Sequence, residues 1–223
     1  MKLKRKIGLV LLLALALGIA ACGKSTPEPV VPETITAAEP ETTAPTATEP
    51  EETVAEETAA PEHTDTLVVY FSATGHTKPL AEFAAEYLSA DLYEIVPETA
   101  YTDADLNYND ASSRTSREQN DAAARPAIAG ELPDLSGYET VIIGHPIWWG
   151  QAPKIIYTFL EHYDWNGKTL VTFCTSASSG LGSSAENLKP FALGNPNWLE
   201  SRRFPIGAEK DDLIAWLSDC GLS

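Results

Sequence analysis

Cysteine is scarce in this 223-residue chain, which contains only Cys22, Cys174 and Cys220. Cys22 ends a short apolar run near the N-terminus, and two further cysteines are too few for a disulfide framework. Neither Cys174 nor Cys220 has a histidine at metal-ligand spacing, and no Ser-His-Asp pattern stands out. We therefore predict no metal ligand and no catalytic residue. Cys174 and Cys220 are expected to be structural, with Cys220 a candidate free thiol.

Basic residues are also scarce. The chain has 15 Lys or Arg against 32 Asp or Glu, and residues 64–223 alone carry ten against 22, a net charge of −12. Because nothing in this balance offsets repulsion from phosphates, nucleic acid is excluded as a partner. The same charge argues against binding of this part of the chain to anionic lipid. A partner protein is expected to present a basic docking face.

No apolar run reaches the roughly 20 residues that a membrane-spanning helix needs. The apolar run at residues 7–21 follows the basic start Lys2–Lys6 and leads into Cys22. This arrangement predicts an export signal over residues 1–22. The segment Ile19–Cys22 resembles a bacterial lipobox, which implies a lipid on Cys22 that anchors the protein on the extracytoplasmic side of a bacterial cell membrane. An ordinary secretory signal that ends near a cysteine is the alternative.

Lysine and arginine are absent between Ser25 and His63, a stretch with ten Glu that is otherwise rich in Thr, Pro and Ala. Since it has no aromatic residue and no apolar period, it cannot bury enough surface to offset the entropy of ordering. We predict a disordered linker over residues 23–63. Residues 64–223 number 160, which is enough for one domain with a hydrophobic core.

Short apolar segments alternate with helical patterns along residues 64–223. Strands are expected over residues 67–71, 91–96, 139–145, 168–174 and, as a weak pattern, 198–204. Helices are expected near residues 80–88, 153–160, 183–193 and 211–220, and one from Ser112 or Ser113 to about residue 123, inside a polar excursion at 101–130. The alternation predicts an α/β fold of three layers, with a doubly wound five-stranded parallel sheet in the order 2-1-3-4-5. The loops after the first, third and fourth strands then meet at the sheet edge where ligands bind in such folds.

The turn after the first strand is rich in hydroxyl groups and leads directly into a helix. It lacks the Gly-Lys-Thr ending of a nucleoside-triphosphate loop and the Gly-x-Gly-x-x-Gly of a dinucleotide fold. It contains Ser72, Thr74, Gly75 and Thr77 instead. Free N–H groups converge at such a turn and the helix dipole makes it electropositive, which predicts a phosphate site. A hydroxyl cap on an ordinary helix is the alternative.

Four motifs together resemble a flavodoxin-like family of small FMN proteins. The turn Ser72-x-Thr74-Gly75-x-Thr77 resembles the flavodoxin phosphate loop. The other motifs are Tyr108-Asn-Asp with Ser113-Arg114, Pro146-Ile-Trp-Trp-Gly150, and Cys174-Thr-Ser-x-x-Ser-Gly180. The resemblance implies that FMN binds with its phosphate on residues 72–77 and its flavin ring between the other two loops. The cofactor-binding residues that it implies are Ser72, Ala73, Thr74, Gly75, His76, Thr77, Pro146, Ile147, Trp148, Trp149, Gly150, Thr175, Ser176 and Gly180.

The adjacent residues Trp148 and Trp149 offer the flat apolar wall that a flavin ring needs. We expect one of them to face the ring while the other packs inward; the alternative is that both are core anchors. His76 either contacts the phosphate or is a solvated loop residue. His145 either approaches the flavin or is a hydrogen-bonded residue at a strand end.

Arg114 and Arg117 lie in the excursion, where they either reach the ligand or lie on a helix surface. The first function that remains is an FMN electron carrier, tethered outside the membrane and docking to a redox partner. The second is an enzyme, an FMN-dependent quinone or flavin reductase, although no second nucleotide-binding motif is present. The third is a flavodoxin-fold binding module without FMN.

Overall fold

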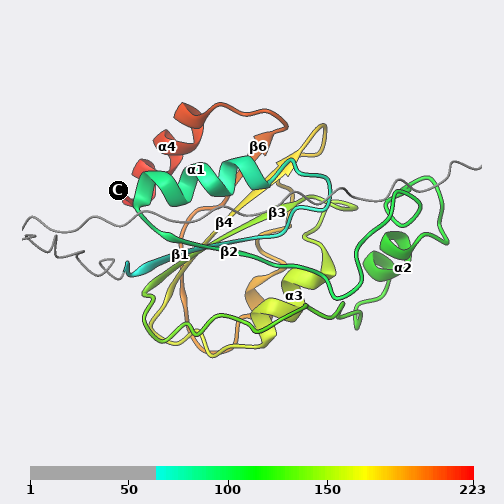
Figure 1. Ribbon diagram of the computed structural model, residues 1–223, viewed down its shortest axis with the longest axis horizontal. Helices are drawn as coiled ribbons and strands as arrows, with labels where there is room; N and C mark the ends of the chain where they lie inside the picture. The colour runs from blue at the N-terminus through cyan, green and yellow to red at the C-terminus, as the bar shows by residue number, and fades with distance from the viewer. Residues whose placement is uncertain (1–63) are drawn as a thin grey trace, which may run out of the picture. The chain divides into compact units, whose positions relative to one another are not determined.

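The computed structural model describes residues 64–223 (Figure 1). The predicted export signal, the lipid-bearing Cys22 and the predicted linker lie outside the described residues. The described strands are β1 (Thr66–Tyr70), β2 (Asp91–Glu94), β3 (Thr140–Pro146), β4 (Thr169–Ser176), β5 (Asn197–Trp198) and β6 (Arg202–Pro205). The helices are α1 (Lys78–Leu88), α2 (Arg114–Asn120), α3 (Lys154–Glu161), α4 (Lys210–Asp219) and the short 3-10 helix η1 (Lys189–Phe191).

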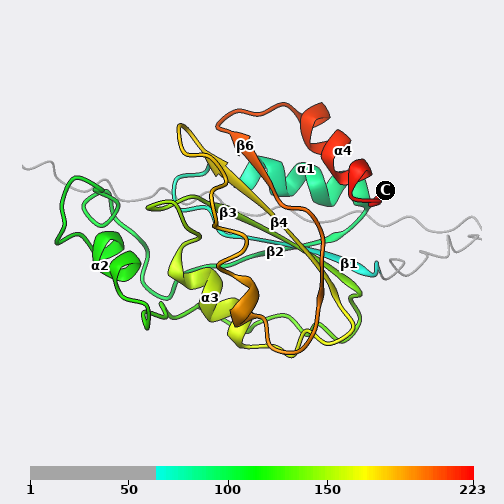
Figure 2. The ribbon, with the colours of Figure 1, turned by 180° about the vertical axis from the view of Figure 1, so that it is seen from behind.

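The strands form one parallel sheet in the order β2-β1-β3-β4-β5, which confirms the predicted topology. Figures 1 and 2 show α1 and α4 on one face of the sheet and α3 on the other. β1 is buried along its whole length, because Val68 and Tyr70 face α1 while Leu67 and Val69 face α3. A strand covered on both faces needs an uninterrupted apolar run, as the sequence has here.

The predicted fifth strand, residues 198–204, is wrong as one continuous element. β5 pairs with the start of β4, and β6 pairs with its end. Between them, the Thr172 hydroxyl donates to the Ser201 hydroxyl (2.8 Å), and the Glu200 carbonyl oxygen accepts from the Trp216 indole of α4 (3.2 Å). The backbone at Glu200 therefore bonds to the α4 layer instead of continuing the ladder with β4.

The helix predicted near residues 183–193 is also wrong. The segment forms successive turns and ends in η1. Pro190 lies within this segment, where it has no N–H to donate to an α-helical ladder, and it forms part of the short η1 instead. Pro153 is the residue preceding α3 and not its first helical residue.

The excursion at residues 101–130 contains α2, as predicted, and Figure 1 shows this helix set apart from the sheet. Ser113 is its N-cap, since the Ser113 hydroxyl accepts from the backbone N–H of Ser116. The helix ends at Asn120, earlier than expected.

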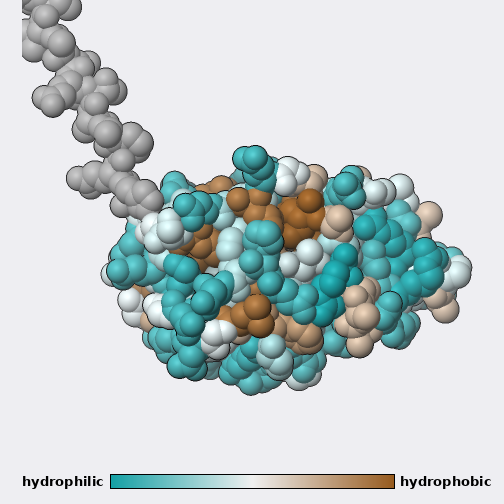
Figure 3. Space-filling model, turned by 90° about the horizontal axis from the view of Figure 1, so that it is seen from below, coloured by the Kyte–Doolittle hydropathy of each residue, from teal (hydrophilic) through white to brown (hydrophobic). Residues whose placement is uncertain are grey.

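Figure 3, a view from the α3 side, shows hydrophilic residues surrounding smaller hydrophobic patches. No helix within residues 64–223 is long and apolar enough to cross a membrane.

Candidate functional site

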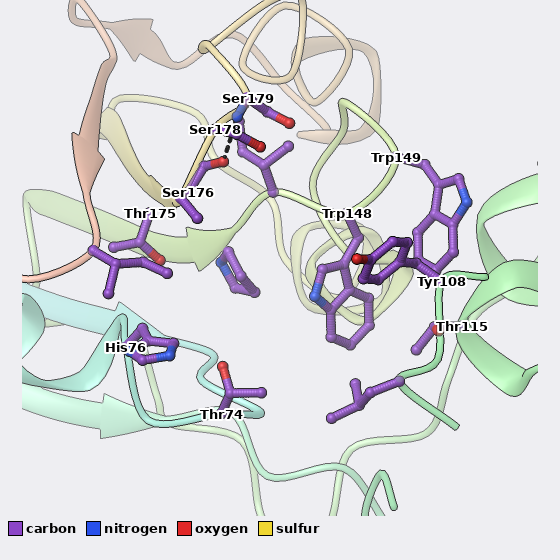
Figure 4. Close-up of a pocket in the computed structure, with 15 residues that line it drawn as sticks. Thr74, His76, Tyr108, Thr115, Trp148, Trp149, Thr175, Ser176, Ser178 and Ser179 are labelled. Carbon is purple, nitrogen blue, oxygen red and sulfur yellow. Dashed lines mark hydrogen bonds between the residues drawn. The ribbon is translucent and has the colours of Figure 1, made fainter. Parts of the chain in front are cut away.

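A cavity of about 430 Å³ opens at the carboxyl ends of β1, β3 and β4 (Figure 4). This volume is within the range of small-molecule sites, about 300–1,000 Å³. Figure 4 shows Thr74 and His76 at one end of the cavity and Trp148, Trp149 and Tyr108 at the other. The lining residues are Thr74, His76, Leu106, Tyr108, Thr115, Pro146, Ile147, Trp148, Trp149, Thr175, Ser176, Ala177, Ser178, Ser179 and Ile206.

The turn between β1 and α1 forms the hydroxyl-rich end of the cavity. The Ser72 hydroxyl accepts from the backbone N–H of Thr77 (3.1 Å) and of Lys78 (3.3 Å), so these two donors are not free as the sequence suggested. The N–H groups of Thr74 and His76 have no hydrogen-bond partner within residues 64–223. These donors and an exposed threonine hydroxyl therefore lie just before α1, where the helix dipole favours an anion.

The structure places Thr77 outside the cavity lining. It is buried, and its hydroxyl lies 2.8 Å from the hydroxyl of Thr175 on β4. This hydrogen bond joins the first loop to the third, so Thr77 supports the cavity without lining it. Ser72 and Ala73 line a separate cavity of about 150 Å³. Gly75 does not line either cavity.

The loop after β3 forms a tight turn from Trp148 to Gln151. Each of these two residues donates its N–H to the carbonyl oxygen of the other, at 2.9 and 3.0 Å. The two central residues both have positive φ, +50° for Trp149 and +74° for Gly150, which is the pattern of a type I′ turn. The left-handed region is unusual for a bulky side chain, and such residues concentrate at ligand sites.

The two tryptophans differ in burial, with Trp148 partly buried against the core and Trp149 exposed. Trp148 packs edge-to-face on Phe71 (5.5 Å between ring centroids) and on Tyr101 (5.2 Å). Trp149 is 40% exposed and is not a core residue. Both line the cavity, so the inner residue contributes an anchored ring and the outer one a ring whose conformation depends on the turn. Gly150 lies in the turn but outside the lining.

The loop after β4 closes the third side. Ser176 is buried, and its hydroxyl accepts from the backbone N–H of Ser179 (2.9 Å), the dashed line in Figure 4. The Ser176 carbonyl oxygen accepts from the Arg203 guanidinium on β6 (2.6 Å). Of the predicted residues, Thr175 and Ser176 line the cavity and Gly180 does not. Ala177, Ser178 and Ser179 line it as well, and their place in the same loop was the only signal for them.

Sequence reasoning missed four lining residues that come from other segments: Leu106, Tyr108, Thr115 and Ile206. Three of them belong to the excursion, and Tyr108 was noted only as part of a resemblance. Tyr108 is 75% exposed at the cavity mouth. The sequence has no hydrophobic period that distinguishes these residues from their polar neighbours. Their position at the cavity is therefore seen only in the folded structure.

The candidates Arg114, Arg117 and His145 do not line the cavity. Arg114 pairs with Glu118 (2.7 Å) and its guanidinium lies 4.0 Å from the centre of the Tyr101 ring, while Arg117 donates to the Ser112 carbonyl oxygen. His145 is fully buried, and burial lowers its pKa to about 4, so its ring is neutral at pH 7. Its Nδ1 lies 3.0 Å from the Pro146 carbonyl oxygen.

Electrostatically, the cavity offers dipoles and not fixed charges. None of the described lining residues is Asp, Glu, Lys or Arg, and His76 is the one histidine among them. No cluster of three or more potential metal-ligating side chains occurs within residues 64–223. The site is therefore suited to an anionic group held by N–H and hydroxyl donors, next to a flat apolar body.

The family model described as Flavodoxin matches residues 65–220, and the chain belongs to this family. Its fold is flavodoxin-like. A crystal structure from Bacteroides eggerthii, provisionally described as that of a flavoprotein, is 42% identical, covers 71% of this chain and 99% of its own, and has a TM-score of 0.66. A similarly described Bacteroides uniformis structure is 41% identical, covers 70% and 99%, and has a TM-score of 0.66. A Lactobacillus acidophilus flavoprotein in complex with FMN is 25% identical, covers 69% and 98%, and has a TM-score of 0.54. No curated protein matches the chain.

Proposed function

We propose that this protein binds FMN non-covalently in the 430 Å³ cavity and transfers electrons to or from a protein partner. The phosphate would lie on the free N–H groups of Thr74 and His76, and the flavin ring between the tryptophans and the loop after β4. When bound, FMN supplies one- and two-electron redox chemistry, and the chain supplies the binding, the orientation and the electrostatic surroundings.

One observation carries the proposal: opposite ends of a single cavity offer the two halves of FMN what each requires. Hydrogen-bond donors at a helix start suit a phosphate, and adjacent tryptophans suit a planar ring. These ends come from loops about 70 residues apart in the sequence, which the sheet order brings together. The match of residues 65–220 to the Flavodoxin family model, and a relative whose structure contains FMN, support the same assignment.

We further propose that Cys22 carries a lipid and that the protein acts outside a bacterial cell membrane. The basic start, the apolar run and the Ile-Ala-Ala-Cys sequence support this. A mature protein with Cys22→Ser should be released from the membrane fraction, and retention there would contradict the lipid anchor. The net charge of −12 in residues 64–223 supports a redox partner with a basic docking face.

Titration of the purified full-length protein with FMN and with riboflavin tests the cofactor proposal. FMN fluorescence should be quenched, because a tryptophan ring contacts the flavin. FMN should bind at least about tenfold more tightly than riboflavin, since hydrogen bonds to a charged group contribute about 1.5–3 kcal/mol. Absence of binding, or equal affinity for both flavins, contradicts the assignment of the phosphate end.

A further inference from the structure

Gln119 on α2 makes two hydrogen bonds across the base of the Trp148–Gln151 turn. Its side-chain Nε2 donates to the Trp148 carbonyl oxygen (2.8 Å) and to the Ala152 carbonyl oxygen (3.3 Å). Both acceptors are carbonyl oxygens, which fixes the orientation of the amide with nitrogen toward the turn. A single amide group thus joins the residues on either side of Trp149 and Gly150.

The environment of Gln119 makes this contact more than a surface hydrogen bond. Gln119 is 8% exposed, and its Oε1 atom is buried with no hydrogen-bond partner among residues 64–223. An unsatisfied buried oxygen is costly, so the two bonds made by the same amide must offset that cost. The Trp148 carbonyl oxygen also accepts from the Gln151 N–H, so both of its lone pairs are used.

The turn is a segment that needs such support. Trp149 has a φ of +50°, and bulky residues keep this strained conformation only where surrounding contacts stabilise it. Its side chain is 40% exposed, so packing alone does not hold the ring over the cavity. The reciprocal bonds inside the turn join Trp148 to Gln151, whereas Gln119 ties Trp148 and Ala152, the residue after the turn, to α2.

We infer that Gln119 is a positioning residue that holds the Trp148–Gln151 turn in the form presenting the Trp149 ring to the flavin. This inference rests on the proposed FMN site. Without Gln119 the turn would sample other conformations, and binding would have to order it again. The polar excursion is then part of the cofactor site in two ways, through Tyr108 at the cavity mouth and through Gln119 behind the turn.

The first test is amide hydrogen exchange in the flavin-free full-length protein. In Gln119→Met, which keeps the length and removes the donor, exchange of the Gln151 N–H should become at least about tenfold faster, while exchange within β1 is unchanged. Gln119→Glu is closer in shape but directs carboxylate oxygens at two carbonyl oxygens, so its effect should be larger. If Gln119 acted only by filling space, Gln119→Met would instead have the larger effect, because Glu is closer in shape to Gln.

The matched control is Asn120→Ala. Asn120 is adjacent on α2, but its side chain donates to the Ser116 carbonyl oxygen inside the helix (2.8 Å) and makes no hydrogen bond to the turn within the described residues. Its removal should leave Gln151 exchange as in the wild type. If exchange rises equally in the control, or stays unchanged in both Gln119 variants, the inference is overturned.

The second test measures flavin binding by the same variants. Gln119→Met should weaken FMN and riboflavin by the same factor, about tenfold, because the turn contacts the ring that both ligands share. The visible circular dichroism of the bound flavin should also decrease at saturation. Wild-type affinity and dichroism in a variant with fast exchange would overturn the positioning role. A wild-type protein that binds no flavin would instead contradict the proposed function, and the exchange rates would still decide whether Gln119 holds the turn.

Discussion

The two ends of the cavity are stabilised in different ways. The hydroxyl-rich end, where we propose that the phosphate binds, is called the phosphate end. There the Ser72 hydroxyl accepts from N–H groups five and six residues away, so hydrogen bonds within the turn hold its conformation. At the opposite end, where we propose that the flavin ring binds and which is called the ring end, the Trp148–Gln151 turn has a strained central residue. This turn is bonded to Gln119, 29 residues before Trp148. A local sequence motif can therefore identify the first end, whereas the second depends on contacts that only the folded chain makes.

The largest expected effect separates the two tryptophans of the ring end. Trp148→Ala should lower the free energy of unfolding by about 3 kcal/mol, because it removes a ring packed on Phe71 and Tyr101. Trp149→Ala should change it by less than about 1 kcal/mol, because that ring is partly exposed. Urea unfolding of both variants measures the difference. Equal losses would show that the two rings are not divided into an inner and an outer one.

Acid should act on the ring end through His145, which lies just before the Trp148–Gln151 turn. Burial lowers the pKa of His145 from 6.5 to about 4, so the unfolded state binds the proton more readily between these values. Stability therefore rises with pH through this window, and about 2 kcal/mol should be lost on going from pH 7 to pH 5. The measurement is the unfolding free energy of wild type and of His145→Gln as a function of pH. If the unfolding free energies of both proteins fall equally between pH 7 and pH 5, the acid effect comes from the carboxylates and not from His145.

The bond between Thr77 and Thr175 links the phosphate end to the third loop. Thr77→Val should cost about 1–2 kcal/mol of stability, since it leaves a buried hydroxyl unsatisfied. Thr175→Val should cost a similar amount, and the double variant less than the two losses added. Thermal unfolding of the three variants provides the measurement. Strict additivity would mean that the two hydroxyls do not interact.

The sequence predicted what short segments determine. The strand, turn and helix at residues 66–88 follow from local patterns, and the alternation of strands and helices predicted the observed strand order. It did not predict the break between β5 and β6, which depends on a hydrogen bond between Thr172 and Ser201, 29 residues apart. The helix expected near residues 183–193 failed for a local reason, because apolar spacing was given more weight than Pro190.

The same distinction applies to the candidate site. Eight of the predicted residues line the cavity, all of them at the carboxyl ends of β1, β3 and β4 or in the loops that follow. Leu106, Thr115 and Ile206 could not be predicted, because the excursion and the segment after β6 reach the cavity by paths that no local pattern encodes. Tyr108 was identified only through the resemblance. Thr77 was assigned to the ligand because its motif resembles a phosphate loop, whereas its hydroxyl bonds to Thr175.

The central claim is that the two ends bind different parts of one ligand, and the most direct measurement is a comparison of FMN and riboflavin affinities in Thr74→Val and Trp149→Ala. Thr74→Val should weaken FMN by about tenfold and leave riboflavin unchanged, because only FMN carries the phosphate. Trp149→Ala should weaken both flavins by the same factor, because they share the ring. A Thr74→Val variant that weakens both flavins equally, or neither, would contradict the account.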